Sequence, residues 1–548
     1  MLYWFKRRFD TAMLQAMRKV TGVLVLVAAV LASPAQALDA EAVSGLASEE
    51  LSVRIEAIAA IAAYGDEEAL EILQLLYDGE VYVTEEGQII LEMDELVDAV
   101  TRQPLDPEPD NYDSVVVNNQ MRGDLETAIA ALRLRSKDRD TRFASAQALE
   151  GAEDAALLPV IVEAMEREGD PEIRAMLAQT RSVMELKSED SAVRAAAATA
   201  LGESSDRRVR ELLAAKLEKS PDGDYFEQDG QVRLAALKSV KSIDRRLMLI
   251  DYFGRFFSGL SLGSILLLVA LGLAITYGLL GVINLAHGEM LMIGAYATYV
   301  TQTVFANHFP AALDYYVVAA IPVAFCVAAG VGMVLERTVI RWLYGRPLET
   351  LLATWGISLF LIQLVRQIFG AQNVEVSNPS WMSGGVEFMN VVMPYNRICI
   401  IVFSFIVLLL MWLMLSRTRL GLFIRSVTQN RTMASCVGVP TGRVDLLAFG
   451  LGSGIAGLAG VALSQIGNVG PDLGQSYIID SFMVVVLGGV GQLAGTVYAA
   501  LGLGVFSKFI EPHIGAVLTK ILVLVLIIAV IQKRPQGLFA LKGRAVEA

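Results

Sequence analysis

Residues 277–296 read Tyr-Gly-Leu-Leu-Gly-Val-Ile-Asn-Leu-Ala-His-Gly-Glu-Met-Leu-Met-Ile-Gly-Ala-Tyr, and apolar runs lie on both sides of this stretch. It contains Asn284, His287 and Glu289 with almost no loop to carry these side chains into water. Ionisable groups close to lipid are costly, and where they occur they are functional candidates. The stretch therefore predicts a tight join between two membrane-spanning helices that carries polar chemistry of its own.

The C-terminal half of the chain is apolar enough to lie in a membrane. Residues 251–548 hold 17 basic and 12 acidic residues. Eight runs approach the ~20 residues that a helix needs to cross hydrocarbon. They are residues 257–279, 285–305, 316–335, 351–369, 398–415, 446–466, 481–506 and 517–531. We expect a polytopic transmembrane domain over 251–548, which excludes a soluble enzyme, a fibrous protein and a disordered chain.

The first part of the chain has the opposite character. Residues 38–250 hold 23 basic and 45 acidic residues, in a chain of net charge −13. Such an acidic segment faces water and argues against nucleic-acid binding, which needs a basic surface. Residues 1–37 contain a basic segment, an apolar run and a small-x-small cleavage pattern, which predict a signal peptide. The alternative is an uncleaved signal anchor, and in both cases the domain 38–250 is exported.

The exported domain is repetitive. An acidic or Ser turn, a β-branched residue, an Arg and an Ala-rich helix recur, with the Arg at positions 54, 142, 194 and 233 and a weaker copy at 174. This pattern is similar to HEAT-like helical repeats. An insert at residues 81–117 contains a hairpin signal around Glu85-Glu-Gly-Gln. We expect the charged residues of the domain to form a solvated face and to staple the repeats, not to form a catalytic set.

The basic loops predict the orientation of the spans. Loops 336–349 and 416–443 and the C-terminal tail are rich in Arg and Lys and should be cytoplasmic, whereas loop 370–397 should be outside. Eight straight crossings would leave the basic tail outside. A re-entrant break in the seventh run, at Gly488, Gly489 and Gly491, would return the chain to the outside, so that the last span would place the tail in the cytoplasm. Such a break must be buried in protein, because lipid cannot pair with its freed backbone groups. The alternative is a continuous Gly-rich helix, with another span miscounted.

Two roles are open for the polar residues of the spans. In the first, the polar side chains of Asn284, His287 and Glu289 cap a helix and form a hinge at the cytoplasmic interface. In the second, they contact the substrate directly. A substrate path would also draw on Thr354, Gln465 and Gln492. There is no HExxH motif, and no His lies near a Cys or another His, so we expect no metal site and no catalytic residue.

Loop 416–443 contains a candidate docking element. Its candidate residues are Arg425, Gln429, Asn430, Arg431, Met433, Ala434 and Gly438. We expect a short helix over 427–436 that ends at Gly438 and Pro440. A short amphipathic helix with a Met and small residues suits docking into a groove of another protein. The alternative is an interfacial helix that Arg residues anchor to the membrane.

Three ordered motifs carry a family resemblance. Residues 277–296, residues 418–438 and the segment Arg534-Pro-Gln-Gly-Leu-Phe resemble the signatures of the branched-chain amino-acid-type ABC transporter permeases. Within that family the chain looks most like the urea-transport permeases, which also carry a secreted helical domain. The resemblance implies an all-α fold: a polytopic permease in the bacterial inner membrane, behind an exported HEAT-like domain.

The same resemblance implies the partners. They are a second permease subunit, two cytosolic ATPase subunits and a periplasmic substrate-binding protein, with no nucleic acid and no cofactor on this chain. The chain has no GxxxxGK[ST] phosphate loop, so ATP hydrolysis is expected in the separate subunits. The segment 425–440 would then be the coupling element that the ATPases push.

Three functions remain open. The first is the permease of a urea importer. Urea is small, flat and neutral, so a path of uncharged hydrogen-bonding groups suits it. The second is a permease for branched-chain amino acids or short amides. The third is a membrane-anchored helical-repeat scaffold or receptor, although an anchor does not need several polar and glycine-broken spans.

Overall fold

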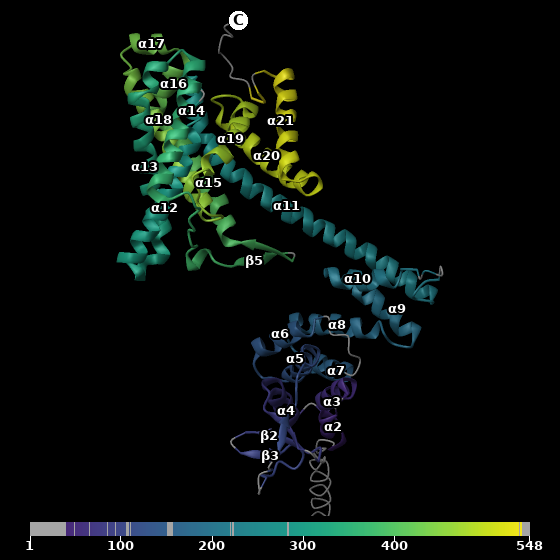
Figure 1. Cartoon of the computed structure of the whole chain (residues 1–548). Coiled ribbons are helices and arrows are strands. Elements are labelled where there is room, and N and C mark those ends of the chain that lie inside the picture. The colour runs from purple at the N-terminus through teal and green to yellow at the C-terminus, as the bar shows by residue number, and fades with distance from the viewer. Residues whose placement is uncertain are drawn as a thin grey trace, which may run out of the picture. The chain divides into compact units, whose positions relative to one another are not determined.

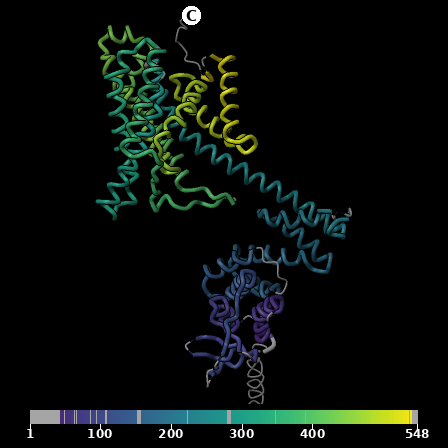
Figure 2. Tube along the Cα trace, viewed as in Figure 1, coloured from purple at the N-terminus to yellow at the C-terminus, as the bar shows by residue number. Residues whose placement is uncertain are grey.

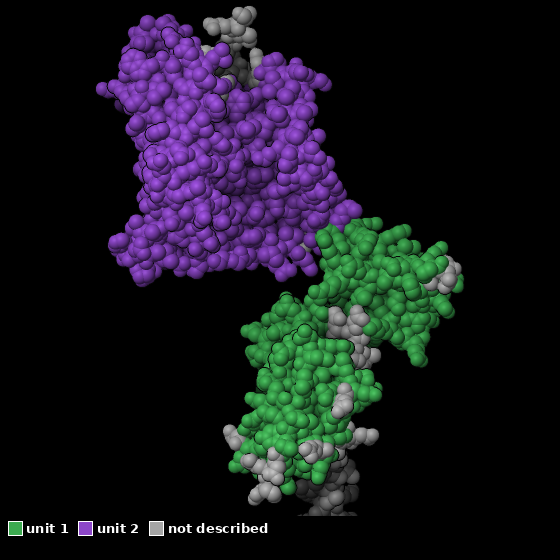
Figure 3. Space-filling view, in the orientation of Figure 1, with its two compact units in different colours: residues 1–247 green, residues 248–548 purple. Residues whose placement is uncertain are grey.

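The computed structural model describes residues 40–539, with gaps at residues 49, 65, 85, 94, 106–108, 110, 151–156, 220, 222–223, 282–283, 389 and 536. The chain forms two compact units, Met1–Leu247 (unit 1) and Met248–Ala548 (unit 2), which Figure 3 shows in different colours. The predicted signal peptide 1–37 lies outside the described residues.

Unit 1 consists mainly of short helices (Figure 1). They are α2 (Ala40–Ser44), α3 (Leu51–Tyr64), α4 (Glu67–Asp78), α5 (Asn119–Arg133), α6 (Arg139–Ala148), α7 (Leu158–Arg167), α8 (Pro171–Glu185), α9 (Ser191–Ala200) and α10 (Arg207–Ala215). An Asp side chain accepts a first-turn N–H in five of them, at Asp66, Asp138, Asp170, Asp190 and Asp206. These caps satisfy N–H groups that a helix start leaves free.

The insert is a small sheet. Strands β1 (Val81–Thr84), β2 (Ile89–Glu92), β3 (Leu96–Asp98) and β4 (Tyr112–Ser114) pair antiparallel in the order β3-β2-β1-β4. The expected hairpin is β1–β2, with Val81 opposite Leu91. The insert is larger than the expected hairpin, because two further strands extend it within a mostly helical chain. Both have three residues, which is too short to show a period of two in the sequence.

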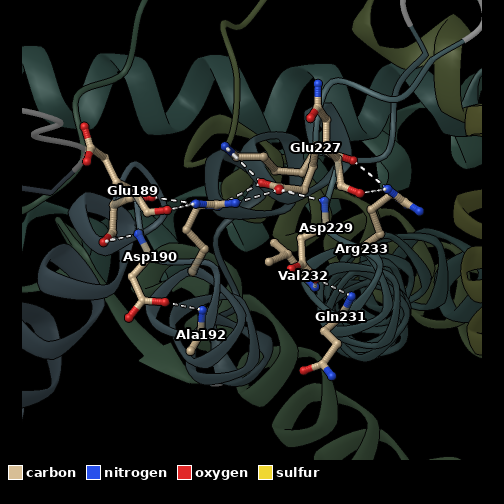
Figure 4. Close-up of polar contacts among 12 residues, drawn as sticks. Glu189, Asp190, Ala192, Glu227, Asp229, Gln231, Val232 and Arg233 are labelled. Carbon is tan, nitrogen blue, oxygen red and sulfur yellow. Dashed lines mark hydrogen bonds and ion pairs between the residues drawn. The ribbon is translucent and has the colours of Figure 1, made fainter.

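The arginine of the repeat holds the loop before its own helix. Arg54, Arg142, Arg194 and Arg233 each donate to the carbonyl oxygen six residues earlier. In the case of Arg194, the Nη1 group also donates to the next carbonyl, that of Glu189, at 2.8 Å. Figure 4 shows this repeat beside the next, where Glu227, Asp229 and Arg233 lie. The shared offset explains why the same residue type recurs at the same place in each repeat.

Two of these arginines also connect neighbouring repeats. Arg194 pairs with Glu227 through two bonds of 3.1 and 2.9 Å, and Arg142 pairs with Glu168 through bonds of 2.8 and 3.3 Å. The side chain of Glu227 is 5% exposed and that of Arg194 is 17% exposed. Burial alone would raise the pKa of Glu227, but hydrogen bonds from Arg194 and from the Asp229 N–H lower it on balance. These residues therefore staple the repeats.

We expect Glu227→Gln to lower the free energy of unfolding of unit 1 by about 3 kcal/mol, because it leaves the Arg194 guanidinium without its counter-charge. Asp244→Asn is the matched control, since its pair with Arg210 is 40–44% exposed, and it should cost no more than about 1 kcal/mol. Pulse proteolysis of the full chain in denaturant measures both. Equal losses of unfolding free energy in the two variants would contradict the role of the Arg194–Glu227 pair in joining the repeats.

This stabilisation should also depend on pH in a defined direction. The folded-state pKa of Glu227 lies below its usual value, so the contribution of the carboxylate is complete above the unfolded-state pKa of about 4.3. It is lost as pH falls through the lower, folded-state pKa. The difference between wild type and Glu227→Gln should therefore shrink only at acidic pH. A difference that shrinks on raising the pH would contradict this assignment.

Unit 2 contains the long helices. They are α11 (Gly230–Leu280), which begins in unit 1, α12 (His287–His308), α13 (Tyr316–Thr338), α14 (Pro347–Phe369), α15 (Tyr395–Arg417), α16 (Arg419–Gln429), α17 (Arg431–Cys436), α18 (Thr441–Ser464), α19 (Leu473–Gly488), α20 (Leu493–Ile514) and α21 (Ala516–Lys533). A hairpin of β5 (Gly385–Phe388) and β6 (Val391–Pro394) precedes α15. Figure 2 traces this course.

The packing at the centre of unit 2 depends on small residues. Helix α18 packs against α12 and α13, and a Cβ added at Gly457 would lie 2.6 Å from the Cβ of Ala328 in α13. One added at Gly454 would lie 2.6 Å from the ring of Phe325. In a membrane, helices associate by such close packing because lipid tails are as apolar as the helices themselves.

The number of spans differs from the prediction. Seven helices of the described chain are long and apolar enough to cross a membrane, whereas α19 has only 16 residues and α12 is not among the seven. The run 481–506 is broken at the predicted glycines, because α19 ends at Gly488 and α20 begins at Leu493, so the alternative of one continuous helix is wrong. The first run is part of α11, which starts well before residue 257, at Gly230.

Candidate functional site

Helix α12 begins in the interior of unit 2, beside α14. The turn before it is held by Asn284, whose Oδ1 accepts the Ala286 N–H at 3.1 Å. Thr354 of α14 accepts the Leu285 N–H at 3.3 Å. Asn284 and Thr354 are both buried. Because lipid offers no hydrogen bonds, the N–H groups freed at a helix start inside a membrane need such partners.

His287 and Glu289 follow this turn and are almost fully buried. Nε2 of His287 lies 3.3 Å from the carbonyl oxygen of Val269 in α11, and the ring donates there in the tautomer with Nε2–H. Oε1 of Glu289 accepts a hydrogen bond from Ser358 of α14 at 2.8 Å. Within the described residues, His287 Nδ1 and Glu289 Oε2 have no hydrogen-bond partner. The two side chains join α11, α12 and α14.

Helix α19 starts beside the same cluster. A Cβ at Gly474, in its first turn, would lie 2.9 Å from Oε2 of Glu289. Asp472, just before α19, pairs with Arg366 of α14 through contacts of 2.8 and 3.0 Å. Four helices therefore meet around the start of α12. The side chains of Asn284, His287 and Glu289 hydrogen-bond to the turn, to α11 and to α14, as a hinge requires, and direct substrate contact stays an open prediction.

The remaining predicted path residues lie elsewhere. Gln465 follows α18, where its Oε1 accepts a hydrogen bond from the hydroxyl of Tyr316 at 3.3 Å. Gln492 lies directly before α20 and is partly exposed. The six residues thus form one cluster of four and two separate positions, and their part in a substrate path stays a prediction. No group of three His, Cys, Asp or Glu in the described part of the chain could hold a metal ion.

We expect Glu289→Gln to keep most of the transport activity and Glu289→Ala to lose most of it. The amide oxygen of Gln still accepts the Ser358 hydroxyl, whereas Ala leaves that donor unpaired and opens a cavity. Ser358→Ala, which removes the donor, should be milder than Glu289→Ala. Substrate uptake by the assembled complex is the measurement. Equal loss in Gln and Ala would place the charge of Glu289 in the transport mechanism.

The predicted re-entrant break lies where α19 turns into α20. Gly489 and Gly491 have φ of 100° and 80°, a region that glycine adopts without steric cost. Gly488 and Gly495 lie so close that a Cβ on either would collide with the backbone of the other. The chain therefore reverses within residues 489–492.

The C-terminal motif 534–539 covers this break. The Leu538 N–H donates to the carbonyl of Leu487 at 2.9 Å, near the end of α19. Gly537, with φ of 79°, lies against Gly489, and a Cβ there would be 2.8 Å from the Gly489 N and Cα. These contacts show that the motif caps a broken helix, a role that sequence spacing does not reveal.

The break also sets the direction of the last helices. Figure 1 shows the end of α21 at the same end of unit 2 as α17, and β5 at the opposite end. The pair α19–α20 therefore brings the chain into unit 2 and back before α21 runs through it. This is the arrangement that the basic tail and the basic loop 416–443 require if both lie on one side of a membrane.

Gly537→Val should lower the thermal stability of unit 2 more than Gly515→Val. Both positions have positive φ, so both variants carry backbone strain of about 1–2 kcal/mol. Only Gly537 faces backbone atoms at 2.8 Å, whereas a Cβ at Gly515 meets nothing within 4 Å. Size-exclusion chromatography of the heated detergent-solubilised protein compares them. Equal melting temperatures would show that the tail does not cap the break.

The predicted helix 427–436 is wrong in its bounds. Helix α16 ends at Gln429, and α17 begins at Arg431. Between them, the side chain of Asn430 accepts the Met433 N–H at 2.9 Å. Asn430 is therefore the N-cap of a second short helix, and the amphipathic period continues across this interruption.

Arg431 fixes α17 to the rest of unit 2. Its Nη1 lies 3.3 Å from Oδ1 of Asp445 in α18, and Nη2 pairs with Oδ2. The guanidinium also lies 4.9 Å from the ring centre of Tyr344, whose hydroxyl donates to Glu336 at 3.1 Å. Sequence reasoning missed these partners. The sequence did carry a signal for Asp445, because it is the single acidic residue within 441–464.

The outer face of this segment is free of unit 2. Met433 and Val437 are 60% and 75% exposed, whereas Ala434 is buried. Arg425 and Gln429 are also exposed. Gly438 follows with φ of 86°, which ends the segment sharply. The segment therefore presents exposed apolar side chains on a short helix that Arg431 holds to α18, and its docking role stays a prediction.

Known proteins resemble both units. Residues 255–531 match the family described as "Branched-chain amino acid transport system / permease component", and residues 53–79 match the PBS lyase HEAT-like repeat. The high-affinity branched-chain amino acid transport system permease protein BraD of Pseudomonas aeruginosa is 32% identical over 294 residues, 52% of this chain and 95% of BraD. The permease proteins LivH of Salmonella typhimurium and Escherichia coli are 29% and 28% identical over 295 residues, with the same shares.

The family match covers more than half of the chain. Together with the seven apolar helices, it indicates a multi-pass inner-membrane transport subunit. The chain belongs to the family of branched-chain amino acid transport system permease components.

Proposed function

We propose that this chain is the membrane-spanning permease subunit of an ATP-driven importer for urea and that it forms half of the translocation pathway. The observation that carries the proposal is the combination of Met433, exposed on α17, with Arg431, which fastens α17 to α18. A held helix with an apolar outer face can pass a push from a soluble partner to the spanning helices. Family membership supports the same class of protein.

The partners follow from this role. A second permease subunit supplies the other half of the pathway, two cytosolic ATPase subunits contact α16 and α17, and a periplasmic binding protein delivers the substrate. Unit 1 is exported behind the signal peptide 1–37, and the C-terminus is cytoplasmic. The basic segment around α17 and the end of α21 share one end of unit 2, which supports this orientation under the positive-inside rule.

Urea is the proposed substrate because the chain combines a permease with a helical-repeat domain, as the urea-transport permeases do. The alternative is a branched-chain amino acid, and the names of BraD and LivH favour it.

The test is substrate-stimulated ATP hydrolysis and uptake by the complex of both permeases, both ATPases and the binding protein in proteoliposomes. We expect urea to stimulate hydrolysis and leucine to have no effect. Stimulation by leucine alone would make leucine the substrate in place of urea, and no stimulation by either would contradict both substrates.

Variants of Met433 test the coupling. Met433→Asp should lower uptake by at least about tenfold, because a carboxylate cannot be buried in an apolar groove without a partner. Met433→Leu keeps an apolar side chain of similar volume and should transport normally. Co-purification of the two permeases controls for folding. Normal uptake by Met433→Asp would exclude α17 as the docking surface.

A further inference from the structure

A second polar region of unit 2 lies away from the start of α12. Four ionisable residues, Asp480, Lys508, Glu511 and Lys520, line a cavity of about 250 Å³ between α11, α19, α20 and α21. Asp480 lies in the middle of the apolar helix α19. Ionisable side chains in membrane helices are costly unless they face a water-filled cavity or each other. Asp480, whose side chain is only 21% exposed, therefore needs a polar partner or water in this cavity.

The cavity adjoins a wider one. Lys508, Glu511 and Ala516 also line a cavity of about 890 Å³ that extends along the first part of unit 2 in α11 and along β6. That wider cavity lies at the end of unit 2 that carries the β5–β6 hairpin, which is the outer end in the proposed orientation. Two ionisable side chains, Lys508 and Glu511, therefore border both cavities.

The carboxylates and ammonium groups of the inner cavity are balanced in pairs. Glu511 pairs with Lys508 at 2.7 Å, and Asp480 pairs with Lys520 at 3.4 Å. The wider cavity adds the pair Arg255–Asp251, at 2.6 Å, and Arg397 as a further cation. A ligand with a net charge would have to break a pair to bind in the inner cavity. A neutral polar ligand can bind without that cost, which favours a neutral solute.

The pair of Asp480 and Lys520 is the looser of the two, and the side chain of Lys520 is 62% exposed whereas that of Asp480 is 21% exposed. A charge-assisted N–H···O bond is usually about 2.7–2.9 Å long, so the 3.4 Å between Lys520 Nζ and Asp480 Oδ2 leaves the pair incompletely bonded. An ammonium has three N–H groups, and a carboxylate accepts about four hydrogen bonds. Both groups keep capacity for a third molecule, and the cavity volume corresponds to only roughly eight water molecules.

We propose that Asp480 and Lys520 form a binding site for a small neutral amide on the transport path. The Asp480 carboxylate accepts the amide N–H groups, and the Lys520 ammonium donates to the carbonyl oxygen. The apolar side chains of Leu262, Leu266 and Met483 line the same cavity and limit its size. This site rests on the proposed function, since it assigns the urea-binding step of the importer to named residues.

The first test removes the pair without leaving a lone charge. Asp480→Leu/Lys520→Met replaces it by apolar side chains of similar size, which spares the fold because no unpaired ion remains. We expect uptake and urea-stimulated ATP hydrolysis to fall at least about tenfold, since two charge-assisted hydrogen bonds to the substrate are lost. Basal ATP hydrolysis and co-purification of the permeases should persist.

The matched control is Glu349→Leu/Arg346→Met. It removes an ion pair of 3.0 Å at the start of α14, where neither cavity lies, and should leave uptake unchanged. If wild-type complex shows no urea stimulation, the proposed function fails. If wild type is stimulated and Asp480→Leu/Lys520→Met is stimulated equally, the site assignment alone fails.

A labelling experiment tests the occupant. Ser476 lines the cavity, and Ile479 lies about one turn away on the same helix and is 63% exposed. In a chain with Cys326, Cys399 and Cys436 replaced by Ser, we expect urea to slow the reaction of Ser476→Cys with a water-soluble thiol reagent and to leave Ile479→Cys unaffected. Protection of Ser476→Cys by leucine in place of urea, or equal protection of both positions, would overturn the amide site.

Discussion

Every backbone N–H and C=O group that unit 2 frees inside a membrane must find a partner in the protein, because lipid supplies none. The chain leaves the helical path at two interior places. Before α12, Asn284 and Thr354 accept the N–H groups of the turn, and after α19 the Leu538 N–H reaches a carbonyl near the broken end. The position of α14 and the path of the C-terminal tail both follow from this requirement.

The features predicted from the sequence are those with local signals. Apolar runs predicted most spans, and the glycines predicted a break in the seventh run, because glycine removes the steric limit at positive φ. The features missed depend on distant residues. Ser358 is 69 residues from Glu289, and nothing in the spacing of α14 shows which hydroxyl faces the carboxylate. The capping role of Asn430 was missed because an amphipathic period continues across a cap.

Unit 1 shows the same division between local and distant signals. The arginine of each repeat was predicted as a staple, and its carbonyl partner lies at a fixed local offset of six residues. Glu227, the carboxylate partner of Arg194 in the next repeat, is 33 residues away. Strands β3 and β4 were missed because three residues show no alternation. Local geometry repeats and is visible in one sequence, whereas contacts between repeats become visible only in the fold.

Helix α19 links the polar regions of unit 2. Its first turn packs Gly474 against Glu289, its middle places Asp480 in the cavity, and its last residue, Gly488, packs against Gly495 where the chain reverses. Sixteen residues of regular helix are stiff, and close packing at both ends leaves no room for independent adjustment. A shift of α12 or of the tail would therefore bear on α19, which forms one wall of the cavity. Rigid-body motion of α19 is thus the physical route by which the hinge cluster around Glu289 and the cavity around Asp480 would change together.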